Sequence, residues 1–340
     1  MLSRLSGAAK GGTIDGMTGV AFTPFETRVD TIIRLARQAE TLGLDRVQVA
    51  EAWSHDATIV LAEIAAQTSR IGLGTGVLSV WGRTPASIAL AAAGLQRASG
   101  GRFSLGLGAG SPPLTEGLHG LRWERPVARV RETVTGVRAL LAGERLPAPA
   151  PGARPLRLGV LPEVPVPIAL AALSDESIRL AGELADEWGP FLWARSRLSE
   201  GRALLDEGAA RRESSTPTRI AVAVPVALGP DAASARRMAA WWLSTYATRM
   251  GPIYPRMLRR FSSAESVEAL QTATDEFPAA AEALAREVTL FGTYEEAPEL
   301  IAAWLEAGAD SVELVLPPGR PEAELAALVE VAATAVTIGA

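Results

Sequence analysis

The 340-residue chain contains no cysteine and only two histidines, His55 and His119. The absence of cysteine excludes disulfides, thiolate zinc sites, iron–sulfur clusters and cysteine nucleophiles. Two histidines are too few for a three-histidine metal site, and they leave only two candidates for the base of a Ser–His–Asp triad. We therefore expect no metal centre. If the chain is an enzyme, a bound organic group should carry its chemistry.

An excess of positive charge is also missing, since 33 Lys and Arg stand against 38 Asp and Glu, for a net charge of −5. Nucleic-acid-binding proteins normally carry a basic stripe, so we expect no nucleic-acid partner. No run of about 18 apolar residues occurs, so we expect no membrane span. Residues 1–16 lack the apolar centre of a secretory signal, and we expect a loose tail and a cytoplasmic protein.

Short apolar runs alternate along the chain with amphipathic stretches of helical length. This alternation predicts parallel strands joined by crossover helices. Eight such units predict a closed (β/α)8 TIM barrel, with a doubly wound open sheet as the alternative. The expected strands are 18–23, 46–50, 70–77, 102–108, 167–172, 186–193, 219–228 and 311–316.

Two segments depart from this alternation. Residues 147–167 hold seven prolines, and we expect an excursion at about 143–166 with a small strand at 156–161. Residues 232–286 have a helical pattern too long for one crossover, so we expect a helical insertion at about 230–290, after the seventh strand. The sequence thus predicts one barrel domain over 17–340 that carries two insertions.

In such a barrel the functional site lies at the carboxyl ends of the strands. Small residues dominate the ends of the third, fourth and fifth strands, at 74–76, 108–110 and 171–172. Glycine and alanine allow a flat ligand to press against the backbone, whereas the alternative is that they only form tight turns. Three neighbouring ends of this kind favour a planar ligand.

Other strand ends carry candidates for catalysis and for substrate binding. Glu51 and His55 follow the second strand and are candidate acid–base groups; a structural carboxylate and an exposed loop histidine are the alternatives. The aromatic group at 241–246 indicates either an apolar wall or a packed helix face. The candidate substrate contacts are Phe22, Trp53, Trp81 and Trp193. For the three tryptophans, packing in the core is the alternative.

Several motifs in order resemble the luciferase-like monooxygenase family, which uses flavins and deazaflavins on (β/α)8 barrels. The resemblance is strongest to its coenzyme F420-dependent branch, which includes methylene-tetrahydromethanopterin reductase and F420-dependent glucose-6-phosphate dehydrogenase. The motifs include Ala39-Glu40-x-x-Gly43, Gln67-Thr68-x-Arg70-Ile71-x-Leu73-Gly74-Thr75-Gly76-Val77, Arg83-x-Pro85, Gly101-Arg102-x-x-Leu105-Gly106-x-Gly108 and Leu180-Ala-Gly182-x-x-Ala185-Asp186.

The resemblance implies where the cofactor ring lies and which residues surround it. It places the ring against the third strand's end, at a non-proline cis peptide matching Gly76–Val77. The dehydrogenase's Asp-His pair is replaced here by Glu51-Ala52, and its acidic residue after the fourth strand by Ser111, so activity on glucose 6-phosphate is not expected. The implied cofactor-binding residues are Gly76, Val77, Ala109, Gly110, Ser111, Ala171 and Ala172.

The resemblance favours hydride transfer between coenzyme F420 and a small organic substrate, with Glu51 or His55 assisting a proton. One alternative is an FMN-dependent monooxygenase that uses oxygen and receives reduced flavin from a partner reductase. Another is a flavin-binding barrel without catalysis. The family also forms homodimers through helices beside the second and third strands, which here points to the Ala-rich helix at 85–99.

Overall fold

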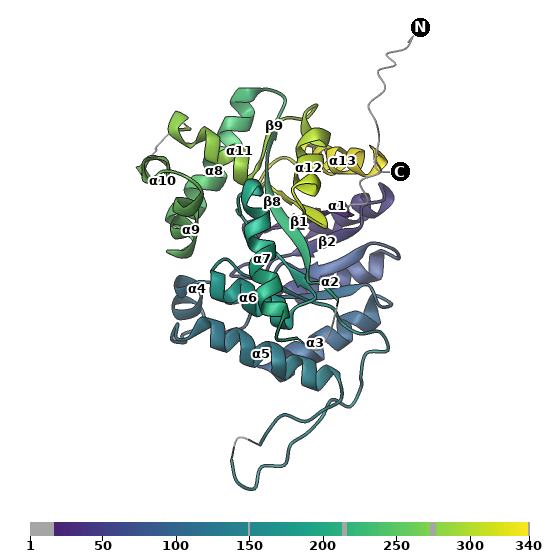
Figure 1. Ribbon diagram of the computed structural model, residues 1–340. Coiled ribbons are helices and arrows are strands. Elements are labelled where there is room, and N and C mark those ends of the chain that lie inside the picture. Colours follow the sequence, from purple (N-terminus) through teal and green to yellow (C-terminus); the bar gives the residue numbers. More distant parts are fainter. Residues whose placement is uncertain (1–16, 149, 213–215, 273–276, 339–340) are drawn as a thin grey trace.

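The computed structural model of the chain describes residues 17–148, 150–212, 216–272 and 277–338 (Figure 1). The N-terminal tail expected at 1–16 lies outside the described residues.

Eight parallel strands form a closed barrel. Strand β10 pairs with both β1 and β8, which joins the two ends of the sheet. This closure confirms the TIM barrel and rules out the open sheet. The barrel strands are β1 (Met17–Phe22), β2 (Arg46–Val49), β3 (Gly72–Thr75), β5 (Phe103–Gly108), β6 (Ile168–Ala171), β7 (Glu187–Trp188), β8 (Arg219–Gly229) and β10 (Ser311–Leu316).

Amphipathic helices cover the outside of the barrel because each buries one apolar side on the strands. Local sequence sets where they begin. Thr84 caps the third helix by accepting a hydrogen bond from the Ser87 amide, and Pro85 occupies its first turn. The covering helices are α1 (Val29–Thr41), α2 (Ala57–Gln67), α3 (Pro85–Ala98), α5 (Pro126–Leu141), α6 (Asp175–Leu184), α7 (Leu198–Ala209), α12 (Ala297–Glu306) and α13 (Glu322–Ile338).

Several elements differ from the sequence-based expectation. The sixth barrel strand is confined to Glu187–Trp188, and Phe191 forms only an isolated bridge to Ala223. The region expected to hold a strand at 156–161 has none, and the connection between α5 and β6 projects from the barrel (Figure 1). The elements that the sequence did not indicate are β4 (Leu78–Ser79), α4 (Pro112–Gly117) and β9 (Leu290–Thr293).

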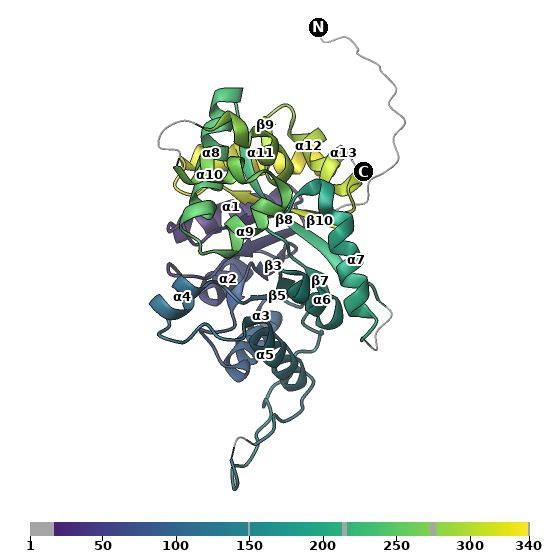
Figure 2. The same ribbon diagram turned by 60° about the vertical axis from the view of Figure 1, so that its left-hand side comes forward.

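A helical segment lies between β8 and β9. The two strands pair in parallel from Val226–Leu290 to Gly229–Thr293, so this segment leaves and rejoins the barrel at one place. Both views show its helices grouped at the end of the molecule opposite the α5–β6 connection (Figures 1 and 2). The helices are α8 (Ala232–Thr248), α9 (Ile253–Phe261), α10 (Ala264–Thr272) and α11 (Glu282–Val288).

A buried ionic network crosses the inside of the barrel. Arg46 of β2 contacts Glu187 of β7 at 2.7 Å and Glu313 of β10 at 2.6 Å. Burial raises the pKa of Glu313, although the Arg46 guanidinium opposes the shift. Removing Arg46 would leave the two buried carboxylates without this cation, so both depend on Arg46.

Candidate active site

A cavity of about 290 Å³ opens at the carboxyl ends of the barrel strands. Its wall is built from the strand ends that the sequence singled out for their small residues. Phe22 and Trp53, two of the four expected substrate contacts, also line it. All seven residues that the resemblance implied for the cofactor line the cavity: Gly76, Val77, Ala109, Gly110, Ser111, Ala171 and Ala172.

The end of β3 has the backbone feature that the resemblance implied, because the Gly76–Val77 peptide bond is cis. The neighbouring strand β5 needs glycine to pass beside it. A Cβ atom at Gly106 would overlap the Thr75 carbonyl oxygen, and one at Gly108 would lie 2.8 Å from Val77 Cγ2. These two glycines therefore allow β5 to pass close to the end of β3 in this wall of the cavity.

Thr23 and Gln48 are polar side chains of the cavity that have no hydrogen-bond partner among the described residues. Thr23, at the end of β1, is 6% exposed, and its hydroxyl is unpaired. Gln48 of β2 places its amide oxygen 2.9 Å from where a Cβ atom of Gly76 would be. No hydrogen bond of this amide to another described residue exists. A buried hydroxyl without a partner is unfavourable, and the Gln48 amide is only half-buried, so both groups are available to a ligand.

Neither Gln48 nor Thr23 was among the site residues expected from the sequence. The available signal was a polar residue inside the apolar strand 46–50, facing the same way as the small residues of the neighbouring strands. Gln48 lies inside β2 and not beyond its end, so its position alone did not mark it as a site residue.

Glu51 lines the cavity but is already engaged. Its carboxylate accepts hydrogen bonds from Arg83, at 2.9 Å, and from the Ala57 amide, at 3.1 Å. Arg83 also contacts Asp56 at 2.8 Å. Hydrogen bonds from Arg83 to both carboxylates outweigh its desolvation and raise its pKa. The geometry thus gives Glu51 the structural role that was the alternative to catalysis.

The structure does not bring His55, Trp81 or Trp193 to the cavity, which corrects three sequence-based expectations. The His55 Nε2 atom lies 3.1 Å from the carbonyl oxygen of Glu26, which belongs to the connection between β1 and α1. Trp193 is 1% exposed, and its indole N–H donates to the Arg197 carbonyl. Trp81 packs instead against Trp123 and Arg129. A strand-end position does not determine the direction in which a side chain points.

The helical insertion supplies another wall of the cavity. The rings of Tyr246 of α8 and Tyr254 of α9 pack edge to face with centroids 4.9 Å apart, and the Phe191 ring centroid lies 4.8 Å from that of Tyr246. Burial raises the pKa of Tyr254 to about 12 and that of Tyr246 well above its usual value. Both phenols therefore stay protonated at neutral pH.

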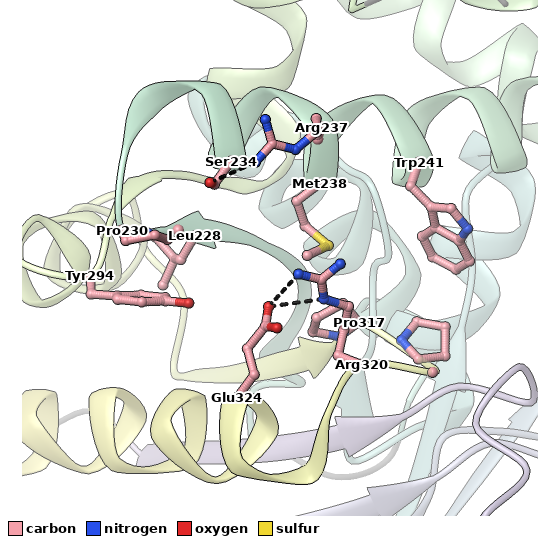
Figure 3. Close-up of a pocket in the computed structure, with 13 residues that line it drawn as sticks. Leu228, Pro230, Ser234, Arg237, Met238, Trp241, Tyr294, Pro317, Arg320 and Glu324 are labelled. Carbon is pink, nitrogen blue, oxygen red and sulfur yellow. Dashed lines mark hydrogen bonds and ion pairs between the residues drawn. The ribbon is translucent and has the colours of Figure 1, made fainter. Parts of the chain in front are cut away.

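A second hollow of about 570 Å³, which we call the rim pocket, lies between α8 and the start of α13 (Figure 3). Its Arg320 pairs with Glu324 at 2.9 Å, and the ring of Tyr294 forms another side. Aromatic side chains connect the rim pocket to the cavity. Trp241 contacts Phe25, and Phe25 in turn contacts Trp53.

Neither a metal centre nor a membrane span is evident in the described part of the chain. Its histidine, aspartate and glutamate side chains form no group of three that could hold a metal ion. None of its helices combines the length and the apolar character that crossing a bilayer requires.

Comparison with known proteins places the chain in a family. The family model of luciferase-like monooxygenases matches residues 10–311. A Mycobacterium tuberculosis protein named "Putative coenzyme F420-dependent oxidoreductase Rv3520c" is 31% identical over 330 residues, which cover 87% of this chain and 93% of the relative.

Solved structures share the fold at lower identity. An F420-dependent secondary alcohol dehydrogenase with an F420-acetone adduct has a TM-score of 0.78 at 18% identity, over 96% of this chain and 99% of that one. The oxygenating constituent of the 3,6-diketocamphane monooxygenase of Pseudomonas putida, in complex with FMN, has a TM-score of 0.70 at 22% identity, over 94% and 98%. The chain belongs to the luciferase-like monooxygenase family and is an enzyme, an oxidoreductase.

Proposed function

We propose that this enzyme transfers a hydride between coenzyme F420, a 5-deazaflavin, and a small organic substrate. The observation that carries the proposal is the cavity wall of glycine and alanine at three neighbouring strand ends, which suits the face of a flat tricyclic ring. The similarity to the mycobacterial protein named for F420 supports the choice of cofactor. Since the chain is an enzyme, the alternative of a flavin-binding barrel without catalysis is set aside.

The residues of the cavity fit such a group. Gln48 lines the cavity with an amide that can donate and accept, and Thr23 offers an unpaired hydroxyl. Both groups suit the carbonyl and imide edge of a deazaflavin. Ser174 and Ser177, at the N-terminal end of α6, line another part of the cavity. These two serines already bond each other, because they form the capping box of the helix.

Bound F420 would supply a carrier of two electrons and one hydrogen as hydride. The chain's own residues have a simpler task, which is to hold ring and substrate face to face and to keep water away. Glu51 contributes to this by fixing the β2–α2 connection through Arg83. Because the carboxylate is held there, we assign it no proton transfer.

Titration of the purified protein with F420 and, separately, with FMN tests the proposal, with ligand fluorescence as the readout. We expect F420 to bind in the micromolar range and FMN to bind far more weakly. Gln48→Leu should weaken F420 binding about fivefold, the effect of losing one hydrogen bond of about 1 kcal/mol. The matched variant Gln67→Leu, on the exposed surface of α2, should bind F420 as the wild type does.

Two results would contradict the proposal. Preference for FMN would indicate oxygen chemistry supplied by a partner reductase, and binding of neither compound would exclude both cofactors. Equal F420 affinity of Gln48→Leu and Gln67→Leu would remove Gln48 from the cofactor site but leave the cofactor assignment intact.

A further inference from the structure

The helical insertion brings two phenol groups, those of Tyr246 and Tyr254, to the wall of the cavity. Neither phenol oxygen of Tyr246 or Tyr254 makes a hydrogen bond to another described residue, and both side chains line the cavity. Tyr246 is 5% exposed. Their elevated pKa values keep the hydroxyl hydrogens in place at neutral pH. Each phenol is therefore a donor without an acceptor.

The other acid–base groups of the cavity already have partners. Among the described residues that line it, only Glu51 and Glu187 are charged, and they pair with Arg83 and Arg46. The cavity thus offers no free positive charge to an anionic substrate. An uncompensated charge in such surroundings is costly, so the cavity selects against charged substrates.

The surface around the phenols is apolar and largely aromatic. Phe191, Met250 and Ile253 line the same side of the cavity, and Trp53 lies on the β2 side. A flat, uncharged molecule with one acceptor oxygen suits both the aromatic wall and the unpaired hydroxyls.

We infer that the Tyr246–Tyr254 pair binds the carbonyl oxygen of an uncharged conjugated enone and gives that oxygen its proton during reduction. The inference rests on the proposed function, in which reduced F420 supplies the hydride. The hydride forms a new C–H bond at the β-carbon, and the C=C electron pair moves to the bond between the α-carbon and the carbonyl carbon. The carbonyl pair moves to oxygen, which takes a phenol proton to give an enol.

The remaining steps balance the reaction. The phenolate regains its proton from water, and the enol becomes the saturated ketone when its O–H proton is lost to water and another proton reaches the α-carbon. One hydride and one proton are added to the enone, and reduced F420 is oxidised by two electrons. General acids of this kind typically contribute 10²–10⁴-fold to rate.

The test uses 2-cyclohexen-1-one as the probe with the variants Tyr246→Phe, Tyr254→Phe and the double variant. Tyr294→Phe, in the rim pocket, is the matched control because it removes the same hydroxyl outside the cavity. We expect kcat/KM to fall about 100-fold in the double variant, mostly through kcat. The solvent isotope effect on kcat should also change, whereas the control should keep the wild-type values.

A second readout does not depend on turnover. In the cofactor-free protein, the infrared carbonyl stretch of bound 2-cyclohexen-1-one should move to lower wavenumber in the wild type. The shift should be absent in the double variant. F420 affinity should be equal in all variants, which shows that the variants are folded.

Each contrary result identifies what has failed. If the wild type binds no F420, both the proposed function and this inference fail. If it binds F420 but the tyrosine variants match the wild type in rate and in carbonyl frequency, only the role of the tyrosines fails. If the wild type reduces glucose 6-phosphate and not the enone, the substrate class is wrong.

Discussion

Ala171 illustrates what a single methyl group determines in this site. It lies at the end of β6 with its side chain exposed to the cavity, and it faces Gly108 of the neighbouring strand. Most interior positions of a TIM barrel carry branched side chains that fill the core. Here the space is left open, so a larger side chain at this position would occupy the ligand's place without displacing packed neighbours.

Ala171→Leu should therefore abolish cofactor binding and leave the melting temperature within a few degrees of the wild type. The added side chain enters open space, so it neither leaves a cavity in the core nor overpacks it. Fluorescence titration with F420 and a thermal melt measure the two effects. Ala203→Leu, on the exposed side of α7, should change neither. Wild-type F420 affinity in Ala171→Leu would place the ring elsewhere.

At the scale of residues, the sequence predicted which small strand-end residues line the cavity better than it predicted which larger side chains point into it. The glycines and alanines of the strand ends line the cavity because the barrel fixes where strand ends meet. His55 and Trp193 do not line it, since their direction depends on local contacts with Glu26 and Arg197. The partner that engages Glu51 is Arg83, which lies 32 positions away, and no pattern in the sequence joins the two.

The connection between β1 and α1 depends on one buried carboxylate. Glu26 accepts hydrogen bonds from Arg28 and from the amide of Gly319, in the loop before α13. Burial alone would raise the pKa of Glu26, but these hydrogen bonds outweigh it and hold the pKa below its usual value. Glu26 thus joins the first and last parts of the barrel.

Glu26→Gln should lower the free energy of unfolding near pH 7 by about 1–3 kcal/mol. A carboxyl group with a lowered folded-state pKa contributes stability above its unfolded pKa, and this contribution is lost as pH falls through the folded-state pKa. The difference between variant and wild type should therefore shrink on going to about pH 3. Urea unfolding at both pH values measures it, and a difference that is the same at both would contradict the ionic role.

At the scale of elements, the long periodic segments were predicted well and the short ones were not. Strand β9 was not predicted because only Thr289 separates its four residues from α11, whose apolar pattern continues into the strand. The sixth barrel strand was expected to reach 193, but only Glu187 and Trp188 pair regularly with both neighbours. An apolar run indicates burial and does not by itself determine where ladder hydrogen bonds end.

For the whole molecule, we propose a homodimer formed through α2 and α3. Ile59 of α2 is 67% exposed and Leu90 of α3 is 60% exposed, and the two helices are neighbours on the barrel. Large apolar side chains exposed on adjacent helices are typical of interfaces.

The double variant Ile59→Asp, Leu90→Asp should sediment as a monomer in analytical ultracentrifugation, whereas the wild type sediments as a dimer. Charges at the centre of an apolar interface lose their hydration without gaining partners. Leu156→Asp changes a residue that is 76% exposed in the α5–β6 connection and should remain dimeric. A monomeric wild type would contradict the proposal.

The closed barrel itself was predictable, because eight strand–helix units leave few other arrangements. Its internal ionic network was not. Arg46 lies 141 positions from Glu187 and 267 from Glu313, and each appears in the sequence as an ordinary charged residue beside an apolar run. Only the closed barrel brings β2, β7 and β10 around one interior.

The pairing of β8 with β9 has a consequence for how this enzyme can be re-engineered. The segment 232–288, which carries both tyrosines, starts and ends on two strands held together by their own ladder. The segment can therefore be exchanged as a unit, without altering the two strands that flank it. Replacing it with the corresponding segment of a relative should change which substrates the enzyme accepts. The strand ends proposed to hold the F420 ring would stay the same.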